Sequence, residues 1–258
     1  MLKTLYYSGS GYLSLGLRDA NGNPLGLFDI GDTGDFKVSL KVDVEEVTED
    51  QTGDHLTAMR LQKAKSATIS MTAKNWSARN LGRVTYGDVL LQGTGTVSNE
   101  VLPNPMLVDG LYLLKHQNVS SVILTDSTPG TPKTLPTGQY TANGPGGSIL
   151  LKDKTAGGPF VEPFKAAYSY GESSSVPMFT KEAEELWLRF EGRNTVPGGG
   201  SFIVDLYRVA LDPAATLDFI TRQVATFPIS GSVLRDDTKV DDAVLGQFGR
   251  IIQPGVGA

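Results

Sequence analysis

The sequence predicts an all-β fold: a two-sheet antiparallel β-sandwich or barrel with a long hairpin loop and one short flanking helix. Two early segments, residues 36–44 and 66–74, alternate apolar and polar side chains with a period of two, as strands with one buried face do. Long alternating segments return near the end of the chain, and short ones separated by Gly- and Pro-rich turns lie between. Long strands that flank a run of short ones favour a closed sandwich or barrel.

The composition is that of a globular protein. The 258 residues are 40% hydrophobic and 20% charged, so the 30 glycines and 14 prolines are expected to punctuate turns rather than to indicate global disorder. All-β folds of this length often form one domain. We therefore expect a single domain over residues 1–258, with a decorated middle section at about residues 104–180.

The first strand of the expected hairpin has an apolar face and a polar face. The apolar face is expected to build the core and consists of Phe36, Val38, Leu40, Val42 and Val44. Residues 45–57 break the alternation, are polar and acidic, and contain a glycine, so they predict a long projecting loop. The returning strand is expected to pair antiparallel with the first and to bury Ala67, Ile69, Met71 and Ala73.

A short helix is expected directly after this hairpin. Ser77 is a suitable N-cap, and Leu81 and Val84 follow it at helical spacing. Residues 93–105 are expected to form a loop. Further strands are expected near residues 111–115, 121–125, 139–142, 149–152, 164–170, 186–191 and 202–207, with a final pair at residues 222–234 and 247–252.

Motifs for catalysis or metal binding are not recognisable. The chain has no cysteine and two histidines, His55 and His116, so one subunit cannot supply the three or four matched donors of a zinc site from these residue types alone. A Gly-x-Ser-x-Gly nucleophile motif does not occur. Residues 19–23 carry oxygens at calcium-loop spacing, but Pro24 stands where the turn glycine belongs, so a hairpin turn is the better interpretation. We expect no enzyme activity and no cofactor.

Neighbouring carboxylates leave one catalytic alternative open. A glycosidase needs two acids that flank the scissile bond. Solvated turns and strand ends explain the same residues more economically. The pairs in question are Asp32 with Asp35, Glu184 with Glu185, and Asp236 with Asp237.

The net charge of −5 argues against a protein whose main task is to grip nucleic acid, because phosphate binding needs a concentrated Lys/Arg surface. No window approaches the roughly 20 apolar residues of a membrane-spanning helix. The first residues also lack the continuous apolar stretch of a signal peptide. We expect synthesis in the cytoplasm and no membrane partner.

The order of strand, long acidic loop, returning strand and helix start (Ser77-Ala-Arg-Asn-Leu81) resembles that of phage tail tube proteins, also called major tail proteins. The resemblance continues through Gly138-Gln-Tyr140 and Ala166-Ala-Tyr168 to the late strands around Leu186-Trp-Leu-Arg and Thr226-Phe-Pro-Ile. It covers nearly the whole chain by pattern rather than by an invariant signature. The tube protein of type VI secretion systems is a related alternative.

The resemblance implies a virion structural protein, made in the host cytoplasm, that forms hexameric rings. The rings would stack into a tail tube through which DNA passes without specific binding. Tape-measure, tail terminator and baseplate or distal tail proteins would be its other partners. In this family the long hairpin loop reaches the neighbouring ring, so candidate inter-ring residues are Glu46, Glu49, Asp50, Asp54, His55 and Leu56.

The polar face of the hairpin is a candidate lining of the tube lumen. Serine and threonine hydroxyls offer hydration with little charge, and acidic side chains would repel phosphates, although Lys37 and Lys41 temper this repulsion. A solvated outer face is the alternative. The lumen candidates are Asp43, Glu45, Ser66, Thr68, Ser70 and Thr72.

A receptor- or carbohydrate-binding β-sandwich is a second hypothesis for function. It depends on tyrosines that could be exposed, because aromatic faces stack on sugars. Core or cross-strand packing is the other use of such residues. The tyrosines are Tyr6, Tyr7, Tyr140, Tyr168 and Tyr170.

Overall fold

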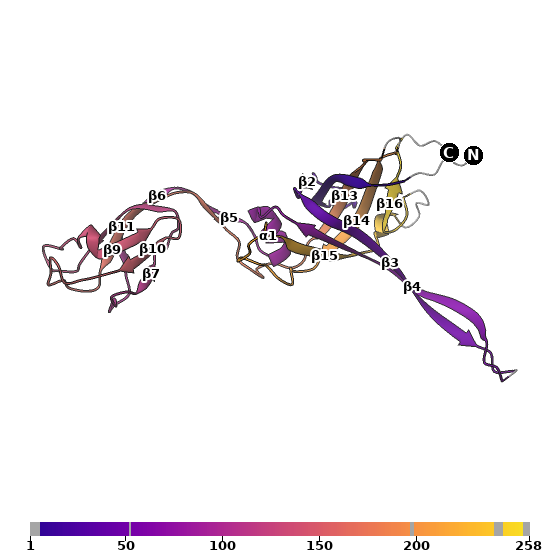
Figure 1. Ribbon diagram of the computed structural model, residues 1–258, viewed down its shortest axis with the longest axis horizontal. Helices are drawn as coiled ribbons and strands as arrows, with labels where there is room; N and C mark the ends of the chain where they lie inside the picture. Colours follow the sequence, from indigo (N-terminus) through magenta and orange to yellow (C-terminus); the bar gives the residue numbers. More distant parts are fainter. Residues whose placement is uncertain (1–5, 52, 197–198, 240–244, 255–258) are drawn as a thin grey trace. The chain divides into compact units, whose positions relative to one another are not determined.

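The computed structural model describes residues 6–51, 53–196, 199–239 and 245–254 (Figure 1). The chain divides into two compact units. Unit 1 comprises Met1–Val89 together with Val176–Ala258, and unit 2 is the intervening Leu90–Ser175. Each unit has its own cluster of buried apolar residues. The section expected as decoration, residues 104–180, overlaps unit 2, which begins and ends earlier than that section.

Unit 1 is built on an eight-stranded sheet. Its strand order is β2-β1-β13-β14-β15-β4-β3, and β16 pairs with β14. The strands pair antiparallel throughout the described residues, as the all-β prediction requires. Their bounds are β1 Gly9–Leu17, β2 Phe28–Asp29, β3 Thr33–Thr48, β4 Thr57–Ala73, β13 Glu185–Asn194, β14 Phe202–Leu211, β15 Phe227–Val233 and β16 Gly249–Ile252. A short 3-10 helix, η2, spans Asp237–Lys239.

The core of unit 1 follows from the alternation of side chains along its strands. In β15 the inward residues Phe227, Ile229, Gly231 and Val233 are buried, and Pro228, Ser230 and Ser232 between them are exposed. The predicted inward face of β4, from Ala67 to Ala73, is buried in the same cluster. These strands are distant in the sequence, so the core forms only when they pair.

A buried carboxylate links three strands of unit 1. Asp205 of β14 lies between Arg189 of β13, at 3.0 Å, and Arg250 of β16, at 3.3 Å. A buried charge is tolerated when it is paired on this scale, because the ion pairs offset the loss of hydration. The network therefore holds the short strand β16 against β14.

The predicted helix is present as α1, Ala78–Thr85. The side chain of Ser77 accepts a hydrogen bond from the backbone N–H of Asn80 at 3.3 Å, as an N-cap does. Val84 is buried in the core of unit 1. The helix ends at Tyr86, whose φ of 53° is left-handed and whose hydroxyl donates to the carbonyl of Leu211.

Unit 2 consists of two three-stranded sheets, β7-β10-β9 and β6-β11-β8, around one shared core. A two-stranded ribbon of β5 and β12 forms its ends. The predicted middle strands are confirmed within a few residues. The bounds are β5 Leu90–Gln92, β6 Gly95–Val101, β7 Leu111–Leu113, β8 Val119–Thr125, η1 Thr137–Gln139, β9 Tyr140–Asn143, β10 Ser148–Leu151, β11 Lys165–Tyr170 and β12 Ser173–Ser175.

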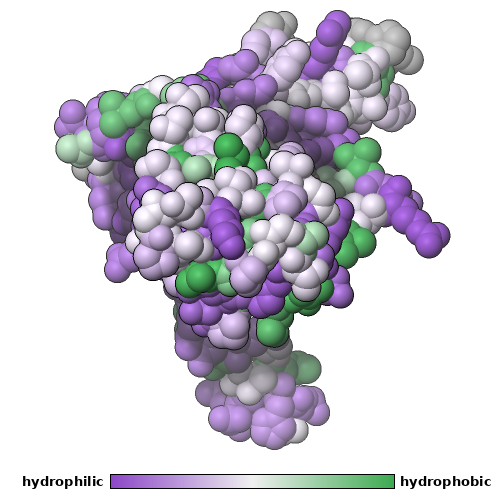
Figure 2. Space-filling model, turned by 90° about the vertical axis from the view of Figure 1, so that its left-hand side faces the viewer, coloured by the Kyte–Doolittle hydropathy of each residue, from purple (hydrophilic) through white to green (hydrophobic). Residues whose placement is uncertain are grey.

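In Figure 2 unit 2 faces the viewer, and its surface is mostly hydrophilic or intermediate (purple to white) with separate hydrophobic spots (green). Unit 2 as a whole has exposed apolar side chains, among them Leu111 and Leu113 of the edge strand β7. Scattered apolar residues are ordinary on protein surfaces. This face of unit 2 therefore gives no reason to assign it a docking role.

Three expectations about strands are wrong. Residues 93–105 are not a continuous loop, because β6 lies within them and pairs with β11. Residues 222–226 lie outside strands, since β15 begins at Phe227. Finally, β15 and β16 do not pair with each other; each pairs with β14.

None of the helices in the described ranges has both the length and the apolar character needed to cross a bilayer.

Candidate functional site

The hairpin of β3 and β4 extends well beyond the rest of the sheet of unit 1 (Figure 1). Strand β15 covers the second edge of β4 only from Ala67 to Ala73. Outward from the Leu40–Ala67 pair, residues 40–48 of β3 and 57–67 of β4 form a ribbon of two strands, which together with the loop residues 49–51 and 53–56 we call the arm. A two-stranded ribbon is at best marginally stable by itself in water, so the arm is a structure that gains from a partner.

The apolar face of β3 lies at the base of this arm. We expected it to build the core of the subunit, and beyond Phe36 this expectation is wrong. Phe36 packs against the core, but Leu40 is 80% exposed, and Val38 and Val42 are also exposed. Strand β3 is at the edge of the sheet, so Val38 and Leu40 are exposed although Ile69 and Ala67, which pair with them, are buried. We call Val38, Leu40 and Val42 the base patch.

The opposite face of the hairpin carries the lumen candidates together. Residues directly opposite each other in an antiparallel pair share a face. The register pairs Lys41 with Ser66, Ser39 with Thr68, Lys37 with Ser70, and Gly34 with Thr72. Asp43 and Glu45 follow on the same face of β3. The lumen candidates Asp43, Glu45, Ser66, Thr68, Ser70 and Thr72 therefore lie on one face of the hairpin. That this face lines a lumen stays a prediction.

The two acidic side chains of this face are paired with lysines. Asp43 Oδ1 lies 2.7 Å from Lys41 Nζ, and Glu45 Oε2 lies 2.5 Å from Lys63 Nζ. The hydrogen bond from Lys41 to Asp43 raises the pKa of that lysine above its usual value. Since each carboxylate has a nearby cation, and Lys37 lies on the same face, the face presents hydroxyls without a net negative field.

The connecting loop is shorter than predicted. Strand β3 continues to Thr48, so Glu46 is paired with Arg60 in the ladder and does not belong to the loop. The loop closes with a bond from the N–H of Glu49 to the carbonyl of Leu56. His55 has a φ of 50°, and its Nδ1 lies 3.3 Å from Asp50 Oδ1. Of the loop candidates, Glu49 is half-buried, whereas Asp50, Asp54, His55 and Leu56 are exposed at the end of the arm.

The sequence analysis missed a second apolar surface, near the end of the arm. Val47, Met59 and Leu61 are exposed there, and we call them the tip patch. Val47 pairs with Met59 and Glu45 with Leu61, so this patch lies on the continuation of the polar face. A register shift opposite Asp43 and Val44 precedes it, and β-bulges of this kind increase local twist. The sequence of β3 does contain a signal for this second apolar surface. Val47 lies two residues after Glu45 and therefore on the same face of the strand, where it replaces the polar side chains that precede it.

Five of the six carboxylates considered for catalysis form ion pairs in unit 1, and the sixth, Asp35, forms none with a described residue. Asp32 forms an ion pair with Lys74, Glu184 with Lys181 and Asp237 with Arg235. A hydrogen bond from Arg208 lowers the pKa of Glu185. Burial by itself would raise the pKa of Asp236, but bonds from Thr238 and Arg18 outweigh it and lower that pKa. A general acid needs a raised pKa, so these shifts run opposite to that role.

The proposed calcium-like turn is a hairpin turn, as predicted. The Asp19 carboxylate accepts hydrogen bonds from the N–H groups of Asn21 and Asn23 at 2.9 and 2.7 Å. Those bonds, first the one from Asn23, lower its pKa. Within the described residues, no group of three or more His, Cys, Asp or Glu side chains is arranged to hold a metal ion. His116 instead stacks on Tyr170, with ring centroids 3.9 Å apart.

The tyrosines considered for sugar binding divide into two groups. Tyr140 and Tyr168 are buried in the core of unit 2, and Tyr170 is covered on one face by His116. Tyr6 and Tyr7 are exposed in unit 1, where Tyr7 packs edge-on against Phe202. Exposure of Tyr140 and Tyr168 is thus a wrong expectation, and core packing accounts for both.

The fold and the arm define a class of protein: an all-β chain with an inserted β unit and a long, uncovered hairpin. The chain belongs to the family described as protein of unknown function UCP028589, whose model matches residues 6–252. No curated protein matches the sequence.

Proposed function

We propose that this chain is the structural subunit of a phage tail tube, which forms stacked hexameric rings around a lumen for DNA. The resemblance of the hairpin, helix and late strands to tail tube proteins gives the proposal its specific form. Its location would be the tail of the virion, and its partners would be other copies of itself together with tape-measure, terminator and distal tail proteins.

The observation that carries the proposal is the arm with its two exposed apolar patches. Leu40 is 80% exposed on the edge strand β3, and Met59 is 55% exposed on the part of the ribbon that β15 does not reach. Exposed apolar groups that recur along one projecting element mark an interaction site more often than chance exposure does. Covering them by other copies of the chain would remove apolar surface from water and would stabilise the ribbon.

The polar face of the hairpin supports the role in DNA passage. A lumen should not hold phosphates, because each neutralised phosphate adds affinity through counterion release. Ser66, Thr68 and Ser70 are exposed hydroxyls, and the nearby lysines Lys41 and Lys63 are engaged by carboxylates. In this proposal the hydroxyls, rather than acidic repulsion, keep the lumen from binding DNA.

Electron microscopy of the purified full-length protein over a concentration series tests the assembly. Rings or tubes of uniform diameter are expected, and sedimentation should show the monomer giving way to large species. A strictly monomeric protein at high concentration, without rings even when co-produced with the other tail proteins, would contradict the proposal. A tube that binds DNA tightly at physiological salt would contradict the lumen assignment alone.

A glycan-binding assay separates this proposal from the receptor-binding alternative. A tail tube subunit should retain no sugar on an array under conditions in which it assembles. Saturable glycan binding by a discrete monomer or trimer would favour the alternative. The buried positions of Tyr140 and Tyr168 already remove two of the side chains on which that alternative depended.

A further inference from the structure

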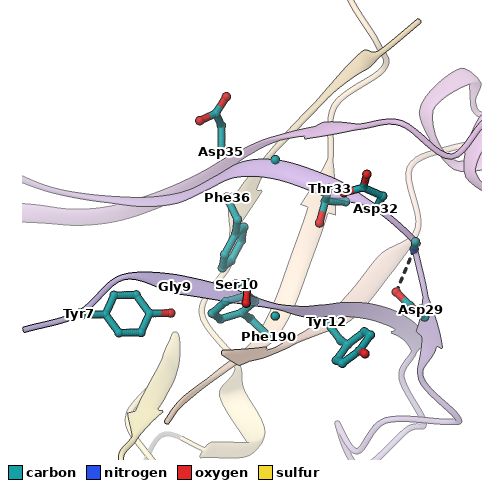
Figure 3. Close-up of a pocket in the computed structure, with 13 residues that line it drawn as sticks. Tyr7, Gly9, Ser10, Tyr12, Asp29, Asp32, Thr33, Asp35, Phe36 and Phe190 are labelled. Carbon is teal, nitrogen blue, oxygen red and sulfur yellow. Dashed lines mark hydrogen bonds between the residues drawn. The ribbon is translucent and has the colours of Figure 1, made fainter. Parts of the chain in front are cut away.

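An open groove lies in unit 1 between β1 and the beginning of β3. It has a volume of about 700 Å³ and is lined by residues 9–12 on one side and 31–36 on the other. Figure 3 shows the two strands on either side of a gap, with Phe36 and Phe190 between them. The two rings lie 5.3 Å apart and give the groove an apolar floor.

Both strand edges that face the groove are open. Strand β1 pairs with β13 along its length, but β2 reaches it only at Ser14 and Leu15. Strand β3 pairs with β4 on one side, and within the described residues it has no strand on the other. Unpaired N–H and C=O groups on such edges accept an additional strand, which is a common mode of peptide recognition.

Gly34 has no packing reason to be a glycine inside its own subunit. A Cβ added there would meet no described atom within 4 Å, and its φ lies outside the left-handed region. Gly11 differs, because an added Cβ would lie 2.3 Å from the carbonyl oxygen of Glu191. Gly34 directly precedes an irregularity in the pairing of β3 with β4, and strand glycines mark such bulges as well as close approach by another backbone. Because no described atom fills the space beside Gly34, a strand from outside the subunit has room to approach it there.

The rim of the groove is acidic. Asp29 accepts a hydrogen bond from the N–H of Gly31, and Asp32 is paired with Lys74 at 3.0 Å. Asp35 is exposed and has no hydrogen bond or ion pair with any residue that the structure describes. An occupant with a basic side chain among strand-forming residues would match both the charge and the open edges.

Residues 219–224 of the chain have this chemistry. Their sequence, Phe-Ile-Thr-Arg-Gln-Val, is rich in β-branched and aromatic residues and contains one arginine, yet the structure leaves it outside strands. Ile220 is 99% exposed, and Phe219 and Val224 are also exposed. The segment is held at one end by Leu217, which packs on the core, and at the other by β15.

We propose that residues 219–224 of one copy occupy the groove between β1 and β3 of a second copy and add a strand there. The inference rests on the proposed self-assembly and names one of its contacts. Groove and segment are different surfaces of the same unit, so the contact is head-to-tail, and repetition of such a contact closes a ring when the rotation permits. Four residues of an extended strand span about 13 Å, so the open residues 9–12 of β1 accommodate four of the six residues of the segment.

Disulfide trapping tests the contact directly, because the natural chain has no cysteine. The double variant Gly34→Cys with Ile220→Cys should give a ladder of crosslinked species on mild oxidation of assembled protein. Mixing the two single variants should give crosslinked dimers and no longer species, since each chain then carries one reactive end. The matched control is the double variant Gly138→Cys with Ile220→Cys. A Cβ added at Gly138 also meets no described atom within 4 Å, but Gly138 lies in unit 2, away from the residues that line the groove.

Two outcomes overturn the inference, and they can be distinguished. If rings or tubes form but the double variant crosslinks no more than the Gly138 control, the contact is wrong and the proposed function stands. If neither the natural chain nor the variants assemble, both proposals fail. As a second measurement, Arg222→Glu should raise the protein concentration needed for assembly about threefold to fivefold, the scale of one exposed ion pair. An unchanged concentration would show that Arg222 does not contact the acidic rim.

Discussion

The substitution Leu40→Ala tests whether the base patch is an assembly contact. It removes three carbon atoms, each of which contributes about 0.8 kcal/mol when buried. Because Leu40 is 80% exposed in the single chain, nearly all of this contribution is available to a partner. We expect a loss of about 2 kcal/mol per contact, which corresponds to about a thirtyfold weaker association. The free energy of unfolding of the monomer should change by less than about 0.5 kcal/mol, as for other exposed sites.

The assay is the protein concentration at which tubes first sediment, with thermal unfolding of the dilute monomer measured in parallel. Leu113→Ala is the matched control, because Leu113 is 72% exposed on an edge strand of unit 2. The control should leave both quantities unchanged. An unaltered assembly concentration for Leu40→Ala would refute the role of the base patch, and a large loss of monomer stability would show that Leu40 is buried in the single chain.

Three further predictions concern stability. Ser77→Ala should destabilise unit 1 by about 1 kcal/mol through loss of the N-cap of α1, and Ser77→Asp should restore most of it, as measured by chemical denaturation. Leu124→Ala and Leu15→Ala should each lower the free energy of unfolding by about 2 to 5 kcal/mol. They should lower the midpoints of different calorimetric transitions, because the two side chains are buried in separate cores. A single transition that both substitutions lower equally would contradict independent unfolding of the two units. Burial alone would raise the pKa of Asp126, yet hydrogen bonds from Thr128, Lys133 and Val161 outweigh it and hold that pKa below its usual value. The stabilisation is therefore present above the unfolded-state pKa of about 4 and is lost as the pH falls below it, so Asp126→Asn should make the melting temperature of unit 2 less dependent on pH in that acidic range.

Local pattern was sufficient to predict much of the fold. The alternation in β4 identified its buried side chains from Ala67 to Ala73, and Ser77 identified the start of α1. Strand β6 was missed because Val97 and Val101 are the only large apolar residues in it, so no period of two was visible. The pairing of β15 with β4 depends on contacts between distant segments, which short windows do not contain.

The arm shows why candidate sites are harder to predict than strands. The apolar period of β3 was recognised, but its place in the core was wrong because burial depends on the position of a strand in the sheet, and β3 lies at the edge. The strand continues through Glu45 and Glu46 to Thr48 with mostly polar side chains, and propensity alone assigns such residues to a loop. The groove beside Gly34 had no sequence signal, because its two walls are formed by segments that meet only in the folded unit.

The ribbon of β5 and β12 has a practical consequence for redesign. Leu90–Gln92 and Ser173–Ser175 are hydrogen-bonded neighbours, so the chain leaves and re-enters unit 1 through a single pair of adjacent strands. Exchange of the sequence between them requires only that the incoming domain have termini a few ångströms apart, as many small domains do. Unit 2 is therefore a natural position for domain exchange, and in the proposed tube an enzyme or an epitope placed there would be displayed at the regular spacing of the subunits.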